Sequence, residues 1–125
     1  MLRSMVAQGL QALYITDLAK WCAIDFASSL SNPLFYAHNL YLNGTLVTEF
    51  KIPEGVTNIG DHAFYGCTGL TSIIIPNSVT YIGEWAFANC GTFEILFEGK
   101  QEEWERIRKG SYWWAYSGCS VTYLK

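Results

Sequence analysis

The sequence predicts an α/β repeat fold, a short right-handed solenoid of about two full repeats flanked by Trp-containing helix and hairpin modules. The first observation is the frame I-P-x-x-V-T-x-I-G-x-x-A-F-x-x-C, which occurs at residues 52–67 and again at residues 75–90. The second is its spacing of about 23 residues, which is typical of solenoid repeats. The third is the composition, because a chain of 125 residues with 50% hydrophobic residues can bury a continuous core.

The repeats are expected to stack, because one copy does not bury enough apolar surface to fold alone. Its roughly six inward side chains contribute about 1.5–3 kcal/mol each. Ordering about 23 residues costs about 1.5 kcal/mol for each of them, which is more. Stacking shares the apolar faces and adds parallel strand pairing between coils. The repeated positions are therefore predicted to be core, and the variable positions surface.

Each coil begins with a short strand, as in LTSIIIP at residues 70–76. Leu70, Ile73 and Ile75 fit an L-x-x-L-x-L strand and are expected to face inward, and Pro76 ends the strand because it lacks a backbone donor. Gly83 is expected to take the positive φ of a tight turn. The stretch EWAFANC then predicts a short helical turn on the same core. The first copy uses the equivalent positions Val47, Phe50, Ile52, Val56, Ile59, Gly60, Ala63, Phe64 and Cys67.

The flanks predict a partial repeat and two Trp-containing helices. GLQALYI at residues 9–15 matches GLTSIII at residues 69–75, and LYITDLAKWCAI at 13–24 can be laid on LFEGKQEEWERI at 96–107. Thr16 and Asp17 favour a helix start before Trp21, which corresponds to Trp104. The dipeptide Asn43-Gly44 between two alternating runs predicts a hairpin, and that turn also accounts for the formal glycosylation sequon at 43–45.

We therefore divide the single domain 1–125 into four parts. Residues 1–15 are expected to form a partial N-terminal repeat, 16–45 a helix plus hairpin insert, 46–92 the two full repeats, and 93–125 a terminal strand, helix and aromatic capping tail. A chain that starts within a repeat and lacks an export signal is expected to be a piece of a longer protein. Its incompletely capped N-terminal end would then favour self-association.

The charge and cysteine patterns limit the kinds of partner and cofactor that the sequence predicts. The formal net charge is −3 and no basic stripe exists, which disfavours nucleic acid. No run approaches the ~18 apolar residues of a transmembrane helix. The cysteines Cys22, Cys67, Cys90 and Cys119 form no C-x-x-C pair and lie at no metal-ligand spacing from a histidine, so neither a metal nor a cofactor is expected. Buried apolar thiols are favoured, with a Cys67–Cys90 disulfide as the alternative.

The frame LTSIIIPNSVTYIGEWAFANC resembles the BspA-like (Treponema-type) leucine-rich repeat, and the resemblance covers about residues 46–97. The segment WCAIDFASSLSNPLFYAHNLYLNG and the tail FEGKQEEWERIRKGSYWW are similar to inserts and terminal modules of bacterial surface proteins with such repeats. The resemblance implies a leucine-rich-repeat solenoid in an extracellular or cell-surface protein. It also implies adhesion or protein binding rather than catalysis.

Two surfaces are candidates for binding, and no residue is a candidate for catalysis. Stacked strands would place their outward residues in one strip that suits a protein ligand. The alternative is a carbohydrate site on the aromatic cluster, since flat rings stack on sugar faces, and the remaining alternative is a structural spacer without a ligand. The candidate strip is Tyr14, Glu49, Lys51, Ser72, Ile74, Glu94 and Leu96, and the aromatic cluster is Tyr112, Trp113, Trp114 and Tyr116.

The ionisable residues do not form a catalytic pattern. Asp61 and Glu84 occupy the same slot of the two repeats, which predicts two steps of one ladder rather than an acid and a base in different environments. His62 aligns with Trp85, so this slot is expected to be a variable surface position. His38 lies near no recognisable nucleophile motif, and Cys22 is expected to be a buried residue of a helix. The sequence therefore predicts a protein that is not an enzyme.

Overall fold

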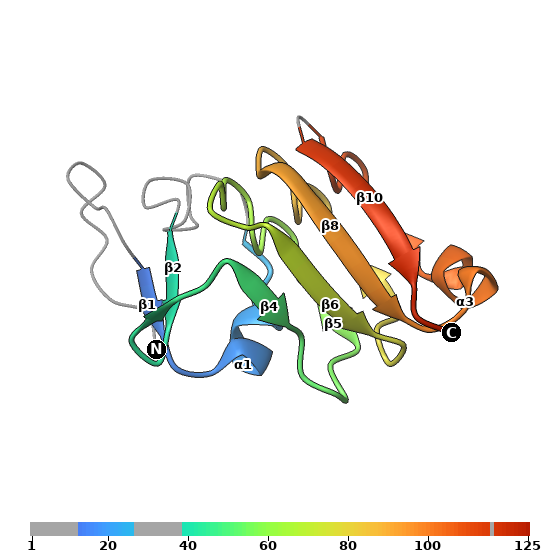
Figure 1. Ribbon diagram of the computed structural model, residues 1–125, viewed down its shortest axis with the longest axis horizontal. Coiled ribbons are helices and arrows are strands. Elements are labelled where there is room, and N and C mark those ends of the chain that lie inside the picture. The colour runs from blue at the N-terminus through green and yellow to red at the C-terminus, as the bar shows by residue number, and fades with distance from the viewer. Residues whose placement is uncertain (1–12, 27–38, 116) are drawn as a thin grey trace.

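The computed structural model describes residues 13–26, 39–115 and 117–125, which form a β-solenoid of about four turns (Figure 1). The main sheet is parallel, with the order β10-β8-β6-β4, and a second parallel sheet has the order β5-β7-β9. A third sheet, β1-β2-β3, lies at the N-terminal end of the described coils. The strands are β1 (Leu13–Ile15), β2 (Leu40–Leu42), β3 (Thr45–Leu46), β4 (Glu49–Lys51), β5 (Asn58–Ile59), β6 (Ser72–Pro76), β7 (Tyr81–Ile82), β8 (Gly91–Glu98), β9 (Arg108–Lys109) and β10 (Ser117–Tyr123).

The first three coils each contribute one strand to each of the two parallel sheets, and the last contributes β10 to the main sheet. The residues between the strands turn the chain. Thr71 N–H donates to Thr48 O at 2.7 Å and Thr80 N–H donates to Thr57 O at 2.8 Å, so equivalent positions of the two copies are bonded directly. The repeated apolar positions lie between the two sheets and are buried, as the repeat predicts. They are Phe50, Ile52, Ile59, Ala63, Phe64, Cys67, Leu70, Ile73, Ile75, Val79, Ile82, Ala86, Phe87 and Cys90, whereas Val56 is half-buried.

The chain between the second parallel sheet and the next coil is a series of turns. Residues 61–66 and 84–89 are turns, which differs from the predicted short helical turn. Tyr65 N–H donates to His62 O, three residues back. The backbone takes a positive φ at His62 (61°) and at Trp85 (59°), which interrupts any helical run within these turns. Because helical dihedrals cannot continue through the left-handed region, the backbone winds as successive turns instead.

The prediction that Gly83 takes a positive φ is wrong, because the positive φ falls two residues later at Trp85. Gly83 is needed for a different reason. A Cβ atom at this position would lie 2.5 Å from Asp61 N and 2.6 Å from Gly60 C in the coil below. Glycine therefore lets the backbones of two coils approach closely.

The hairpin prediction is confirmed at Asn43 and Gly44, which have φ values of 52° and 86°. Strands β2 and β3 pair antiparallel around them, with Tyr41 opposite Leu46 and Leu42 opposite Thr45. Both turn residues take positive φ, as a two-residue hairpin of this type requires.

Two short helices, α1 (Leu18–Cys22) and α3 (Gln101–Arg106), each bury one tryptophan against the coils. Asp17 is the N-cap of α1, and its Oδ1 accepts a hydrogen bond from Lys20 N–H at 3.1 Å. Trp21 is 2% exposed and its indole N–H donates to Ala63 O at 2.8 Å. Trp104 packs edge-on against Phe97 with 5.3 Å between ring centroids. Most of the predicted partial repeat, residues 1–12, lies outside the described residues.

Candidate interaction surface

Strands β4, β6, β8 and β10 lie side by side in one parallel sheet (Figure 1). Because they are in register, the outward face of this sheet carries two continuous rows of side chains. The first row is Glu49, Ser72, Glu94 and Ser120, and the second row is Lys51, Ile74, Leu96 and Thr122. We call these eight residues the sheet face. The structure thus brings together six of the seven residues of the predicted strip and adds two from β10.

The sheet face combines charge, hydroxyl and aliphatic groups. Lys51 Nζ lies 3.4 Å from Glu98 Oε2, and Thr122 Oγ1 donates to Glu94 Oε2 at 3.2 Å. Ile74 and Leu96 are half-buried neighbours on adjacent strands, at the centre of the second row. The face therefore offers a small aliphatic centre with polar and charged groups around it, which is the usual arrangement of a protein-binding surface.

The seventh predicted residue, Tyr14, does not lie on the sheet face. Strand β1 pairs with β2 in the separate sheet β1-β2-β3. The Tyr14 ring is 54% exposed and stacks on Tyr41 with 4.7 Å between centroids. Similarity between residues 9–15 and 69–75 indicated a common strand but contains no information on which sheet that strand joins.

The predicted aromatic cluster divides into accessible and packed rings. Tyr112 is 65% exposed and Trp114 is 49% exposed. Trp113 is half-buried and packs edge-on against Phe87 and Trp104, with centroid distances of 6.5 Å and 5.9 Å. The remaining member, Tyr116, lies outside the described residues.

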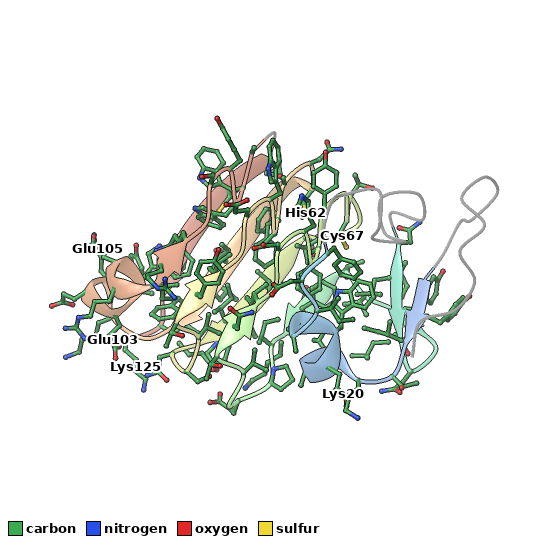
Figure 2. The ribbon with its side chains drawn as sticks, turned by 180° about the vertical axis from the view of Figure 1, so that it is seen from behind. Lys20, His62, Cys67, Glu103, Glu105 and Lys125 are labelled. Carbon is green, nitrogen blue, oxygen red and sulfur yellow. The ribbon has the colours of Figure 1, made fainter. Side chains whose placement is uncertain are left out.

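Tyr112 belongs to a column of rings along the turns of successive coils, which the sequence analysis missed. It stacks on Trp85 with 4.9 Å between centroids, Trp85 lies 6.2 Å from Tyr65, and Tyr65 lies 6.0 Å from His62. His62, Trp85 and Tyr112 also share a positive φ near 60°. Figure 2 shows His62 on the first coil, far from Glu103 and Glu105 of α3. The alignment of His62 with Trp85 indicated that the two residues share a position of the repeat. Tyr112 occupies the same position in the third coil, but the different spacing of that coil hid it from the alignment.

The carboxylates of Asp25 and Asp61 link successive parts of the chain. Asp25 Oδ1 accepts from Asp61 N–H at 3.0 Å, and Asp61 Oδ1 accepts from Glu84 N–H at 2.9 Å. The Asp25 and Asp61 carboxylates thus each accept from a backbone donor of the next coil, and Asp61 and Glu84 lie in the same slot of successive coils, as the repeat predicts. His62 Nδ1 lies 3.0 Å from Phe26 O. Asp25, Asp61 and His62 thus each have a side-chain contact with a backbone group of another part of the chain.

The four cysteines are free thiols in the described residues, three of them buried and Cys119 half-buried. Cys22, Cys67 and Cys90 are 0% exposed, and Cys90 Sγ donates to Phe64 O at 3.1 Å. Burial raises the pKa of Cys22 and of Cys67 to about 12, so neither is a thiolate at neutral pH. The structure therefore shows Cys67 and Cys90 as buried thiols and not as the alternative disulfide.

The described ranges contain no group of three or more His, Cys, Asp or Glu residues placed to hold a metal ion. Within the same ranges, no helix is long and apolar enough to cross a membrane.

A comparison with protein families matches residues 35–123 to the BspA type leucine-rich repeat region, in six copies. Searches among curated proteins and among solved structures gave no match. The matched range includes all of β4 to β10, and thus the whole sheet face.

Proposed function

We propose a function from the premise that the chain belongs to the BspA-type leucine-rich repeat family, whose match spans residues 35–123. Domains of this family typically mediate protein interaction or adhesion and are generally non-enzymatic. The chain is then a non-enzymatic module that binds a protein ligand through the sheet face. We further propose that the chain is part of a bacterial surface or secreted protein, because such repeats imply that location. We also propose that the solenoid is right-handed and that the Trp-containing helices are its flanking modules.

The in-register outward rows of the main sheet carry this proposal. Four coils place equivalent side chains side by side, so one ligand can contact several coils at once. The centre at Ile74 and Leu96 is aliphatic and half-buried, and binding a ligand there removes apolar surface from water. Carboxylates at Glu49, Glu94 and Glu98 disfavour a polyanion and suit a partner with complementary basic groups.

A binding measurement tests the proposal. Wild-type protein and the Ile74→Ala/Leu96→Ala double variant are immobilised and screened against a panel of purified secreted and surface proteins. Central anchor residues cost more than about 1 kcal/mol each when truncated, so the double variant should bind a true ligand at least about tenfold more weakly. Leu46→Ala is the matched control, because Leu46 is an exposed aliphatic residue (44%) of the separate sheet. Equal loss in both variants, or retained binding in the double variant, would reject the sheet face.

The alternative function is carbohydrate binding at Tyr112 and Trp114, which the exposure of these two rings favours. A sugar would stack on the ring face of Tyr112 that is turned away from Trp85. Intrinsic tryptophan fluorescence across a panel of soluble glycans tests this alternative. A sugar-dependent change that Tyr112→Ala abolishes would support it, and constant emission across the panel would remove it. A chain that fails both tests would be a structural spacer.

A further inference from the structure

The sheet face has an acidic row and an aliphatic row. In the first row carboxylate and hydroxyl groups alternate from strand to strand, in the order Glu49, Ser72, Glu94 and Ser120. Glu49 and Glu94 are exposed, and neither forms an ion pair within the described part of the chain. In the second row, Ile74 and Leu96 lie side by side on β6 and β8. A ligand that spans both rows therefore meets negative charge on one side and aliphatic surface on the other.

The cation of the sheet face does not cancel this negative charge. Lys51 lies two residues after Glu49 on β4, in the second row. Its ammonium group lies 3.4 Å from Glu98 Oε2, so its charge is engaged on the side of the sheet away from the first row. The Thr122 hydroxyl that donates to Glu94 Oε2 is neutral. The first row is therefore left with two negative charges, which favour a cationic partner.

The register of the sheet fixes the separation of the two carboxylates. Glu49 is paired with Ser72, and Ser72 is paired with Glu94, so the two glutamates lie on strands two apart. Adjacent strands are about 4.8 Å apart, which places the α-carbons of Glu49 and Glu94 about 9.6 Å apart across the strands. A ligand that contacts both carboxylates needs two cations at about this spacing.

A polyproline II segment supplies this spacing. It has three residues per turn and a rise of about 3.1 Å, so residues i and i+3 lie on one side, about 9.3 Å apart. Residues on one side of a β-strand are about 6.7 Å or 13 Å apart. Residues seven apart on an α-helix are about 10.5 Å apart. The polyproline II spacing is the closest of the three, and its free backbone carbonyls can accept from the Ser72 hydroxyl.

We propose that the sheet face binds a proline-rich basic segment of a protein ligand, in the polyproline II conformation and running across the strands; this rests on the proposed function of the sheet face. Basic residues i and i+3 of the segment pair with Glu49 and Glu94. Residue i+2 is apolar, because it lies about 6.2 Å along the segment, between Ile74 and Leu96. Proline at i+1 faces solvent and fixes the extended backbone.

Fluorescence anisotropy with two labelled peptides of the same composition tests the spacing. The first peptide is four repeats of Arg-Pro-Leu. The second is four repeats of Arg-Leu followed by four prolines, so no two of its arginines are three residues apart. Titrated with the intact chain at low ionic strength, the first should bind at least about fivefold more tightly. Equal affinities, or tighter binding of an alanine-rich helical peptide with arginines seven residues apart, would overturn the proposal.

Two double variants locate the peptide on the protein. Glu49→Gln/Glu94→Gln removes both charges of the first row and should weaken binding of the Arg-Pro-Leu peptide at least about fivefold at low ionic strength. Glu84→Gln/Glu102→Gln removes two exposed carboxylates outside the sheet face and should leave the affinity within about twofold of wild type. Both variants change the net charge equally, so equal losses would indicate general attraction to an acidic protein and would contradict the assignment.

The peptide and the protein panel together distinguish the basic segment from the proposed function. Ile74→Ala/Leu96→Ala should also weaken the peptide, because residue i+2 loses its aliphatic contact. If a panel protein depends on Ile74 and Leu96 but the peptide does not bind, the basic segment is wrong and the proposed function stands. If the peptide binds with the expected dependence on Glu49 and Glu94, the basic segment is supported, whichever panel proteins bind.

Discussion

Ile82 and Lys109 occupy equivalent positions of neighbouring coils, and their environments differ sharply. The two residues are paired in register on β7 and β9. Ile82 is 0% exposed, whereas Lys109 is half-buried and extends its ammonium group to Trp104 O and Ile107 O at 2.8 Å and 3.1 Å. The ammonium also lies 4.5 Å from the centroid of the Trp104 ring. One coil thus continues the apolar core and the next ends it.

The backbone pairing, however, is the same in both coils. Gly83 N–H donates to Ile59 O at 2.8 Å, and Gly110 N–H donates to Ile82 O at 2.7 Å. Tyr81 is paired with Asn58 on one side and with Arg108 on the other, and the Arg108 guanidinium carbon lies 5.2 Å from the Tyr81 ring centroid. Close backbone approach therefore defines a coil, and the side chains decide whether another coil can follow.

The largest expected difference between the coils is in aromatic truncation. Phe87 is 0% exposed and stacks on Phe64 at 5.3 Å, so Phe87→Ala should cost about 3–5 kcal/mol of unfolding free energy. Trp113 of the third coil is half-buried, and Trp113→Ala should cost clearly less because water already reaches the ring. Urea denaturation followed by circular dichroism measures both. Equal costs would show that the third coil is as deeply packed as the second.

The next largest difference is expected at the glycines. Gly83→Ala places a methyl group 2.5 Å from Asp61 N, between two coils that are both covered, and should cost about 1–3 kcal/mol. Gly110→Ala meets Glu84 N at the same 2.5 Å, but β9 is an edge of its sheet, so the third coil can shift outward there and relieve the contact. Its cost should therefore be smaller. A larger loss of the urea midpoint for Gly110→Ala than for Gly83→Ala would refute this interpretation.

The regular coils could be predicted from the sequence because their side chains repeat with a constant spacing. Leu70, Ile73 and Ile75 are buried as the strand pattern predicted, and Asn43-Gly44 forms the predicted hairpin. These features depend on local propensity and on burial, and both leave a pattern in one sequence. The hand of the solenoid and the division at residues 15, 45 and 92 remain predictions.

The third coil was not recognisable because helix α3 replaces the Pro-containing segment and Lys109 replaces the inward isoleucine. Its turn also replaces Trp85 by Tyr112, so only the glycine of the frame remains. The reason for Gly83 was likewise hidden, since a close contact between coils is a tertiary property. The same holds for Tyr14, whose sheet depends on the pairing of β1 with β2.

The thiols extend the comparison to pH. Burial raises the pKa of Cys67 from 9.0 to about 12. Cys119 of the last coil is only half-buried, and its pKa is raised to about 11. A raised pKa in the folded state means that stability is complete below pH 9 and falls as the unfolded chain loses protons first. Each thiol should then lower the unfolding free energy by about 1.4 kcal/mol per pH unit above pH 9, up to its folded pKa.

Single alanine variants separate the two thiols. Unfolding of wild type should release about one proton from Cys67 between pH 9 and 12, and Cys67→Ala should remove that contribution from the slope of unfolding free energy against pH. Cys119→Ala should remove the same contribution only up to about pH 11. Urea midpoints measured at several pH values, each relative to wild type at the same pH, give the slopes. Identical slopes over the whole range in both variants would mean that the last coil protects its thiol as well as the first.

The smallest expected effect is on the outward face, at the ion pair between Lys51 of β4 and Glu98 of β8. The side chains are 55% and 27% exposed and the N–O distance is 3.4 Å, so the pair should contribute at most about 0.5 kcal/mol. Lys51→Met keeps the aliphatic stem and should lower the urea midpoint only slightly, with the difference disappearing in high salt because exposed charges are screened. Lys20→Met, which removes the same positive charge from an exposed position of α1, is the control for net charge. A loss above about 1 kcal/mol that persists in salt would mean that the first and third coils are coupled across β6, and the outward face would then be part of what holds the solenoid together.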